Sequence, residues 1–159
     1  MKEDMKIYIR MILKIVIFGF FFNLLWEVLH SMLYDWNKSP LINDIYVYIP
    51  RITGFASALD SLWIFTFIVW TSLMKRSLSW LKKPEVMDYV VFIVAGIIYA
   101  IFFEWMALML DLWSYNEYMP LVFGIGLTPL IQLALTGVIS LFFASKLKWV
   151  EKSEIISTR

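Results

Sequence analysis

Apolar residues gather in long blocks along this chain, separated by short polar segments. Four blocks are predominantly apolar over about 20 residues or more, the length that an α-helix needs to cross about 30 Å of hydrocarbon. We predict transmembrane helices over residues 5–34, 52–74, 88–111 and 121–145. The blocks are about twice as long as a barrel strand and do not alternate strictly, which argues against a β-barrel. The expected fold class is an all-α integral membrane protein, with residues 1–159 forming a single transmembrane domain.

Basic residues are distributed unevenly among the segments that flank these helices. Twelve of the fourteen lysines and arginines precede the first apolar block, lie at 75–87 or follow the fourth block. Only Lys38 and Arg51 fall in the other two loops, at 35–51 and 112–120. Because Lys and Arg are enriched in cytoplasmic segments, we expect a multi-pass protein of the cell membrane. Both termini and the 75–87 loop should be cytoplasmic, and the loops at 35–51 and 112–120 should lie outside.

The composition narrows the function classes. Hydrophobic residues make up 61% of the chain and charged residues 17%, against about 45–50% and about 25% in soluble domains. A soluble enzyme is therefore excluded. The net charge of +1 gives no bulk attraction to nucleic acid, so no nucleic-acid partner is expected. The absence of cysteine excludes thiol catalysis and thiolate metal sites. Membrane lipids and a hydrophobic small molecule are the expected partners.

The two halves of the chain share a weak pattern. In each half a glutamate in the first helix is followed by an aspartate close to a tryptophan, and the loop then ends in proline with glycine four residues later. This pattern is consistent with a parallel repeat of two two-helix units. Chance similarity between apolar helices is the alternative explanation.

Each predicted helix carries its polar residues on one face. Spacings of four, three and four place the polar residues of the first helix in one stripe; they are Asn23, Glu27, His30 and Tyr34. The second helix has Ser57, Asp60 and Ser61, and the third has Glu104 among small residues. In the fourth helix, polar or small residues recur at every fourth position from 124 to 140 and include Gln132. Such faces are typical of helix interfaces inside a membrane.

Three carboxyl groups lie at a similar expected depth. Counted from the ends of the outer loops, Glu27, Asp60 and Glu104 are roughly 10–14 Å below the outer surface at 1.5 Å per residue. Three ionised carboxylates without partners would cost on the order of 8–10 kcal/mol to insert. His30 is the only histidine in the chain, and it cannot neutralise all three. Either some carboxyls are protonated, or a cation is bound, or water reaches them.

We therefore predict a polar pocket with Glu27, His30, Asp60 and Glu104 as catalytic residues. The predicted substrate-binding residues are Asn23, Tyr34, Trp113, Tyr115 and Gln132. The leading function is an intramembrane acid–base enzyme, of isomerase, cyclase or hydratase type, that acts on a hydrophobic lipid or isoprenoid. In such chemistry Glu27 or Glu104 donates a proton and His30 recovers it. Aromatic residues that could line the pocket are Trp26, Tyr34, Trp105, Trp113 and Tyr115. An interfacial aromatic belt is their alternative role.

Three other interpretations remain open. No cofactor is predicted, but Glu27, His30, Asp60 and Glu104 could hold a divalent metal, since Glu-x-x-His on one helix face is a ligand pair in di-iron bundles. A small proton-coupled transporter of a cationic or hydrophobic solute would also use buried carboxyls. With only four spans, it would require a homodimer. Finally, the polar residues could serve only to hold the helices together.

Two resemblances bear on these interpretations. The sequences NLLWEVLHSMLY at 23–34 and ALDSLW at 58–63, with segment 113–132, resemble a group of small four-helix prokaryotic membrane proteins. This resemblance implies no particular activity. A second, local segment resembles lycopene cyclase domains, and this resemblance implies proton-initiated carotenoid cyclisation. It rests on Asp111-x-Trp113-x-Tyr115 followed by Gly126-x-x-Pro129-x-x-Gln132. Those domains have a proline-led pair of glutamates. Gln132 stands where an acid is wanted, so Glu104 or Glu27 would have to take that role.

Overall fold

The computed structural model describes residues 2–35 and 50–147 and is dominated by four long helices. They are α1 (Lys2–His30), α3 (Ser57–Lys75), α4 (Val86–Met109) and α5 (Leu127–Lys146). Shorter elements are the 3₁₀ turns Ser31–Leu33 and Ser79–Lys82, the π-helical turn Arg51–Ala56, and the hairpin of β1 (Leu121–Val122) and β2 (Ile125–Gly126). Four helices in the described chain are long and apolar enough to cross a membrane, so the predicted all-α class is confirmed.

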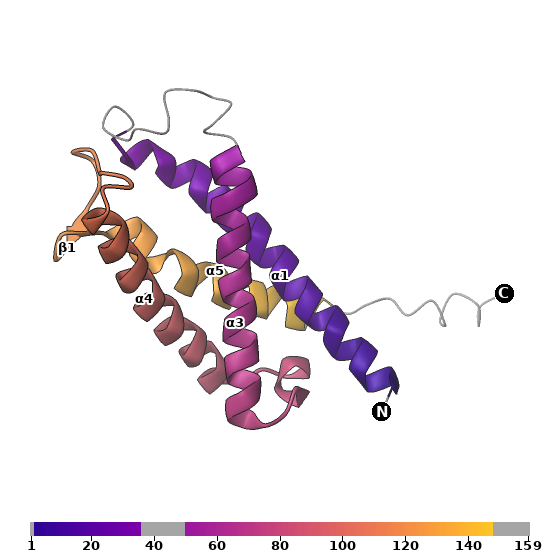
Figure 1. The fold of residues 1–159 in the computed structure, drawn as a ribbon. Helices are drawn as coiled ribbons and strands as arrows, with labels where there is room; N and C mark the ends of the chain where they lie inside the picture. The colour runs from indigo at the N-terminus through magenta and orange to yellow at the C-terminus, as the bar shows by residue number, and fades with distance from the viewer. Residues whose placement is uncertain (1, 36–49, 148–159) are drawn as a thin grey trace.

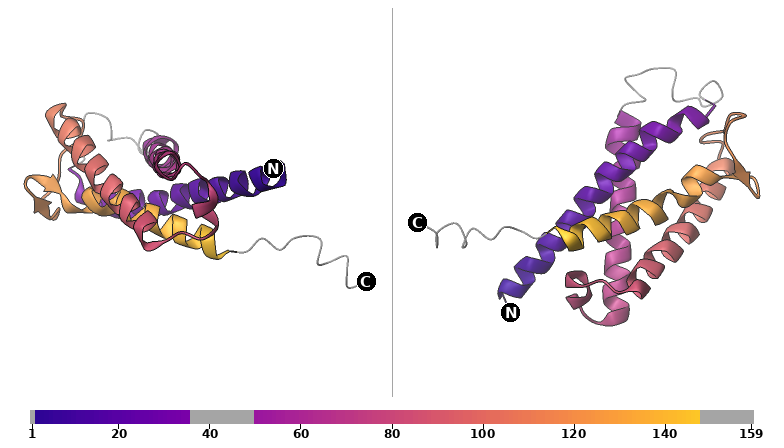
Figure 2. Two further views of the ribbon diagram at one scale, coloured as in Figure 1. Left: turned by 90° about the horizontal axis from the view of Figure 1, so that it is seen from below. Right: turned by 180° about the vertical axis from the view of Figure 1, so that it is seen from behind.

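The helices are packed unequally (Figure 1). α1 packs against α3 and α5, and α5 also packs against α4, whereas α3 and α4 make few contacts with each other. Figures 1 and 2 show α3 and α4 close together where residues 76–85 join them and well apart at their other ends. The approach of α4 to α5 is close because Gly96 has no side chain, and a Cβ atom there would lie 2.5 Å from the backbone nitrogen of Ala134.

The main apolar core and the main group of buried polar residues lie toward opposite ends of the bundle, although the buried polar residues Thr71 and Asp88 lie at the core end. The fully buried core includes Ile15, Ile64, Phe92 and Leu141 and lies toward the 76–85 connection and the C-terminal end of α5. Buried polar residues, among them Asn23, His30, Ser57, Glu104 and Gln132, lie toward the other end of the helices. One end of the bundle is therefore built as an apolar core and the other as a polar site.

The start of α4 is fixed by a capping box. Glu85 is the N-cap residue, and its backbone N–H donates to the Asp88 carboxylate over 2.8 Å. The other oxygen of this fully buried carboxylate lies 2.6 Å from Lys75 Nζ at the end of α3. The helix begins at residue 86 instead of the predicted 88, because this box satisfies the first backbone donors.

The fourth helix begins later than predicted. Residues 121–126 form the β1–β2 hairpin instead of helix, and the backbone at Phe123 and Gly124 is left-handed, with φ of 51° and 83°. Pro129 then lies in the first turn of α5, where its missing N–H has no helical acceptor. Pro129 therefore breaks no hydrogen bond inside the helix, since Ile125, four residues before it, belongs to β2.

The other predicted boundaries shift by a few residues. α1 begins at residue 2 and ends at His30 with a 3₁₀ turn beyond it. α4 ends at residue 109, because Asp111 is left-handed, with φ of 50°. The second span begins with the π-helical turn at residue 51. Most of the predicted 35–51 loop lies outside the described residues, and the proposed equivalence of the two halves stays a prediction.

Candidate functional site

A cavity of about 420 Å³ lies at the polar end of the bundle, among all four helices. Its volume falls in the range of small-molecule sites, about 300–1,000 Å³. The polar side chains that line it include Glu27 and His30 from α1, Asp60 from α3, Glu104 from α4 and Gln132 from α5. The structure thus brings the four residues predicted as catalytic, and Gln132, around a single space.

The amide of Gln132 joins two of the carboxyl groups. Its Nε2 lies 2.8 Å from Glu27 Oε1 and 2.8 Å from Asp60 Oδ2, and it also lies 3.2 Å from Asn23 Oδ1. Because both carboxyl oxygens lie 2.8 Å from one nitrogen, they are at most twice that distance apart. An amide has only two N–H donors, so a single neutral group supports two neighbouring carboxyls.

Asn23 lies behind this network and does not line the cavity. It is fully buried, its Nδ2 donates to the Gly19 carbonyl over 2.9 Å, and its Oδ1 lies 3.0 Å from Thr136 Oγ1. The structure therefore places Asn23 outside the set of residues that line the cavity. The residue instead fixes Gln132 from the side away from the cavity.

Glu104 is held by a different set of partners. Its Oε2 accepts hydrogen bonds from Trp113 Nε1, at 3.2 Å, and from the hydroxyl of Tyr115. Burial and the neighbouring Glu104 carboxyl raise the pKa of Tyr115, so the phenol is a neutral donor at physiological pH. Trp113 lines the cavity, whereas Tyr115 does not and acts on Glu104 from behind.

The segment that carries these two donors is fastened to the end of α1. Asp35 N donates to the Ser114 carbonyl over 2.9 Å, and Asn116 N donates to the Leu33 carbonyl over 3.1 Å. The Tyr34 ring packs against the rings of Trp113 and Tyr115, with centroids 6.2 and 5.6 Å away. We call Tyr34, Trp113 and Tyr115 the aromatic cap, because they cover the cavity at the end farthest from the apolar core.

His30 and Glu27 form the predicted pair on α1. His30 Nε2 lies 3.3 Å from Glu27 Oε2, and the imidazole ring lies edge-on to Tyr34 at 5.3 Å. The spacing of three residues on one helix explains this contact. Both oxygens of Glu27 are therefore in contact with protein groups, one with Gln132 and the other with His30.

Two carboxyl oxygens have no partner within the described chain. Gln132 occupies Oδ2 of Asp60, and the aromatic cap occupies Oε2 of Glu104, but no described group binds Asp60 Oδ1 or Glu104 Oε1. Asp60 and Glu104 both line the cavity, and neither oxygen is among the fully buried atoms without a partner, so we infer that both oxygens face the cavity. They are the atoms with which a bound molecule can exchange a proton.

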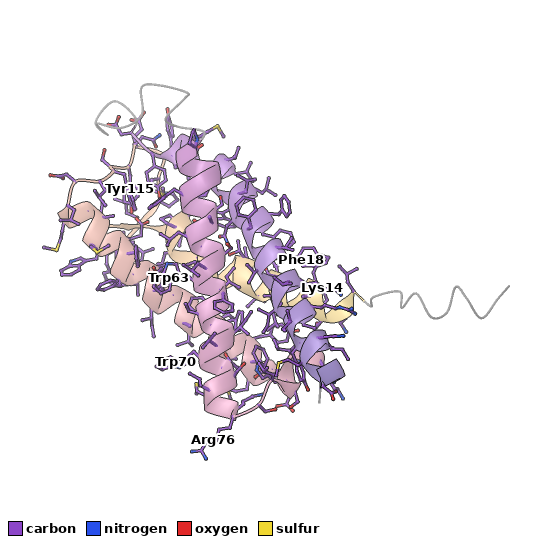
Figure 3. The ribbon with its side chains drawn as sticks, turned by 45° about the vertical axis from the view of Figure 1, so that its right-hand side comes forward. Lys14, Phe18, Trp63, Trp70, Arg76 and Tyr115 are labelled. Carbon is purple, nitrogen blue, oxygen red and sulfur yellow. The ribbon has the colours of Figure 1, made fainter. Side chains whose placement is uncertain are left out.

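The aromatic wall of the cavity was only partly predicted. Trp63 of α3 packs on Tyr99 of α4 with ring centroids 3.9 Å apart, and Tyr99 stacks on Phe103 at 4.4 Å. These three residues line the cavity, and Figure 3 shows Trp63 between α3 and α4, with Tyr115 beyond the end of α4. Trp63 is one helical turn from Asp60, a spacing that could have revealed it.

Two other predicted aromatic residues do not line the cavity. Trp105 is mostly exposed on the outer face of α4, and Trp26 lies elsewhere on α1. Their positions follow from the helical period, since Trp105 and Trp26 each directly adjoin a cavity glutamate in sequence and so point to a different side of the helix.

The metal hypothesis has no support from the positions of these side chains. Within residues 2–35 and 50–147, no group of three or more His, Asp or Glu side chains is arranged to hold a metal ion. Gln132 Nε2, a hydrogen-bond donor, lies between the carboxyls of Glu27 and Asp60. A donor in that place does not fit a cation that bridges these two groups.

Comparison with known proteins adds no functional information: no family model, curated protein or solved structure matches this chain. The two resemblances described above therefore rest on their quoted residues alone. Gln132, the position at which the cyclase resemblance breaks down, holds the carboxyls of Glu27 and Asp60.

Proposed function

We propose that this chain is an intramembrane enzyme that moves protons to and from a hydrophobic lipid or isoprenoid substrate. The observation that carries the proposal is the pair of free oxygens, Asp60 Oδ1 and Glu104 Oε1, that face one mostly apolar cavity. Their surroundings differ, and a site whose two carboxyls have different surroundings can separate an acid from a base.

The acid is the Glu27–Asp60 pair. Their oxygens lie on one neutral amide in an apolar site, where two negative charges would repel each other, so we assign one shared proton to the pair. Asp60 presents that proton to the cavity through its free oxygen, while Glu27 remains bound to His30 and Gln132. His30, which lies next to Glu27, can also carry a proton and return it to the pair after Asp60 has donated its own.

The base is Glu104. The two donors of the aromatic cap, Trp113 Nε1 and the Tyr115 hydroxyl, stabilise negative charge on its carboxylate. Its free oxygen can accept a proton from a substrate carbon. This assignment refines the sequence-based expectation, in which Glu27 or Glu104 was the proton donor.

The reaction class that fits is a proton-initiated isomerisation or cyclisation. Asp60 transfers its proton to one carbon of a C=C bond, which leaves a cation on the other carbon. The faces of Trp63, Tyr99 and Phe103 stabilise that positive charge. Glu104 then removes a proton from an adjacent carbon and a new C=C bond forms, so the substrate gains and loses one proton. The proton returns from Glu104 to the Glu27–Asp60 pair across the cavity.

One observation favours this enzyme over the transporter. A transporter must open its site to both sides of the membrane in turn. Here the apolar core, with Ile64, Phe67 and Phe92 in contact, closes the bundle on the 76–85 side of the cavity. The distribution of basic residues favours a cytoplasmic position for that side, and on this ground we infer that the cavity lies in the outer half of a cell membrane. A second copy of the chain is not needed to complete this site.

The proposal is tested by isotope incorporation. The purified chain in lipid nanodiscs is incubated in D₂O with a panel of unsaturated lipids that contains linear polyprenols, a carotenoid and a sterol. We expect mass spectrometry to find deuterium on carbon of at least one class, and Asp60→Asn and Glu104→Gln to abolish it. Glu117→Gln, a change at an exposed glutamate, is the matched control and should retain incorporation.

The same samples distinguish the alternatives. If Asp60→Asn and Glu104→Gln incorporate as much deuterium as the unchanged chain, the acid–base assignment is wrong. Proton flux driven by a solute into sealed vesicles, without deuterium on carbon, would favour the proton-coupled transporter instead.

A further inference from the structure

The exposure of the cavity walls differs from one side to the other. The walls formed by α1 and α5 are closed, as shown by His30 and Gln132, whose exposed fractions are 6% and 4%. In the π-helical turn before α3, by contrast, Phe55 lines the cavity and is 69% exposed, and Leu59 on α3 is partly exposed. On α4, Phe103 and Met106 also line the cavity and are partly exposed. The exposed rim therefore lies on α3 and α4.

The packing of the helices agrees with this difference in exposure between the walls of the cavity. α3 is held by α1 and α4 is held by α5, while the backbones of α3 and α4 separate away from the 76–85 connection (Figures 1 and 2). The ring of Trp63 contacts Tyr99 and Phe103 across this gap, so the two helices are bridged there, and Leu59 and Met106 lie beyond these rings. The aromatic cap covers one end of the cavity and the apolar core closes the other. In the described chain the remaining opening is the side between α3 and α4.

That opening faces the hydrocarbon of the membrane. The outward residues that flank it are large and apolar, with Leu62 on α3 and Phe102 on α4 both more than half exposed. Surfaces of this kind on a spanning helix are in contact with lipid chains. A molecule that passes between Leu59 and Met106 therefore comes from the bilayer and not from water.

We propose that the cavity is loaded sideways from the bilayer, through an entrance between α3 and α4, and that its occupant is an uncharged molecule rich in hydrocarbon. Among the described residues that line the cavity there is no lysine or arginine to balance an anionic headgroup, which would lie close to the carboxyls of Glu27, Asp60 and Glu104. This inference rests on the proposed function only in assuming that the cavity receives a ligand.

The test uses the carboxyls of the cavity as chemical traps. A carbodiimide adds the O–H of a protonated carboxyl across one C=N bond, and acyl migration to nitrogen leaves a stable adduct from which no atom is lost. The chain in phosphatidylcholine vesicles is treated with dicyclohexylcarbodiimide, which dissolves in the bilayer, or with a carbodiimide that carries a fixed quaternary ammonium and stays in water. Mass spectrometry locates the adducts.

We expect the apolar reagent to modify Asp60 or Glu27 and the charged reagent to leave both unmodified. Leu59→Trp and Met106→Trp, which narrow the entrance, should slow the modification about tenfold, corresponding to about 1.4 kcal/mol in the barrier. The matched controls Leu73→Trp and Val94→Trp place the same bulk on exposed positions of the same helices away from the entrance, and should react at the unchanged rate. Leu59→Ala, which widens the entrance, should react at least as fast as the unchanged chain and shows that position 59 tolerates substitution.

Three outcomes would overturn the lateral entrance: modification by the charged reagent at a comparable rate, equal slowing by the entrance and control variants, or no modification by either reagent. The formation of carbodiimide adducts does not require that the chain convert a substrate. If the apolar reagent behaves as expected but no lipid incorporates deuterium, the entrance stands and the proposed enzyme activity fails.

Discussion

The side-chain amide of Gln132 lies 2.8 Å from Oδ2 of Asp60, and so joins α5 to α3 although these two helices touch little elsewhere. The same nitrogen reaches Glu27 on α1. One neutral side chain thus sets the spacing of the two carboxyls that form the proposed acid. This relationship also explains why a glutamine suits the position at which the cyclase resemblance would require an acid.

Replacing Gln132 by leucine should destabilise the chain. The change removes the donor shared by Glu27 and Asp60 and leaves buried acceptors unsatisfied, which costs about 1–3 kcal/mol per group. Thermal unfolding in detergent measures the loss. Glu27→Gln in the Gln132→Leu background should recover part of it, because one of the two competing charges is removed. If Gln132→Leu unfolds at the same temperature as the unchanged chain, the amide does not support the carboxyls.

Replacing Tyr115 by phenylalanine should remove one of the two donors that stabilise Glu104. A hydrogen bond to a charged group contributes about 1.5–3 kcal/mol, and the loss should appear both in unfolding temperature and in a weaker proposed base. Tyr118→Phe changes an exposed tyrosine and serves as the control. Equal effects of the two substitutions would contradict the role given to Tyr115.

The contribution of Tyr115 should also depend on pH. Burial and the Glu104 carboxyl raise the pKa of Tyr115, so the folded chain keeps the phenolic proton more tightly than the unfolded chain does. The resulting stability is present below the ordinary tyrosine pKa of about 10 and is lost as pH rises above it. The difference in unfolding temperature between the unchanged chain and Tyr115→Phe should therefore be constant near neutral pH and shrink above about pH 10.

Adding a methyl group at Gly96 should push α4 away from α5. The new Cβ would lie 2.5 Å from the backbone nitrogen of Ala134, and overpacking of this kind costs about 1–3 kcal/mol. Gly54→Ala is the matched control, since a Cβ there meets no atom within 4 Å. We expect Gly96→Ala to lower the unfolding temperature and Gly54→Ala to leave it unchanged or raise it. Similar behaviour of the two variants would show that α4 and α5 do not approach this closely.

Replacing Lys75 by methionine should destabilise the end of the bundle opposite the cavity. The change leaves the fully buried carboxylate of Asp88 without its cation. We expect a loss of about 1–3 kcal/mol, below that for a fully buried pair because Lys75 is 33% exposed. Lys82→Met breaks the exposed pair with Asp4 and should cost little. Chemical denaturation compares the two, and an equal loss would mean that Asp88 is supported by the capping box alone.

The positions of the four long helices could be predicted because they depend on local properties of the chain. A run of about 20 apolar residues must satisfy its own backbone hydrogen bonds in lipid, whatever surrounds it. The start of α5 could not be predicted in this way. Leu121 and Val122 are apolar enough to extend the helix, but they lie in a hairpin that the left-handed backbone at Phe123 and Gly124 turns back.

The face on which each polar residue lies was also determined by the sequence. The helical period placed Glu27 and His30 together, as the structure shows, and placed Glu104 among small residues that pack against another helix. A period describes one helix at a time. It does not tell which faces of different helices pack against each other. For that reason Tyr99 and Phe103 were missed as cavity residues, and Trp105 was wrongly included among them.

The sequence by itself determined that this is a helical membrane protein with acidic groups inside its helices, because length, hydropathy and period are local and the cost of a buried carboxyl is general. Only the tertiary structure decided that Gln132 supports Glu27 and Asp60, that the aromatic cap supports Glu104, and that all four long helices line one cavity. These features depend on how far apart the helices pack. That distance is set by small residues such as Gly96 and by contacts between residues more than 70 positions apart in the sequence.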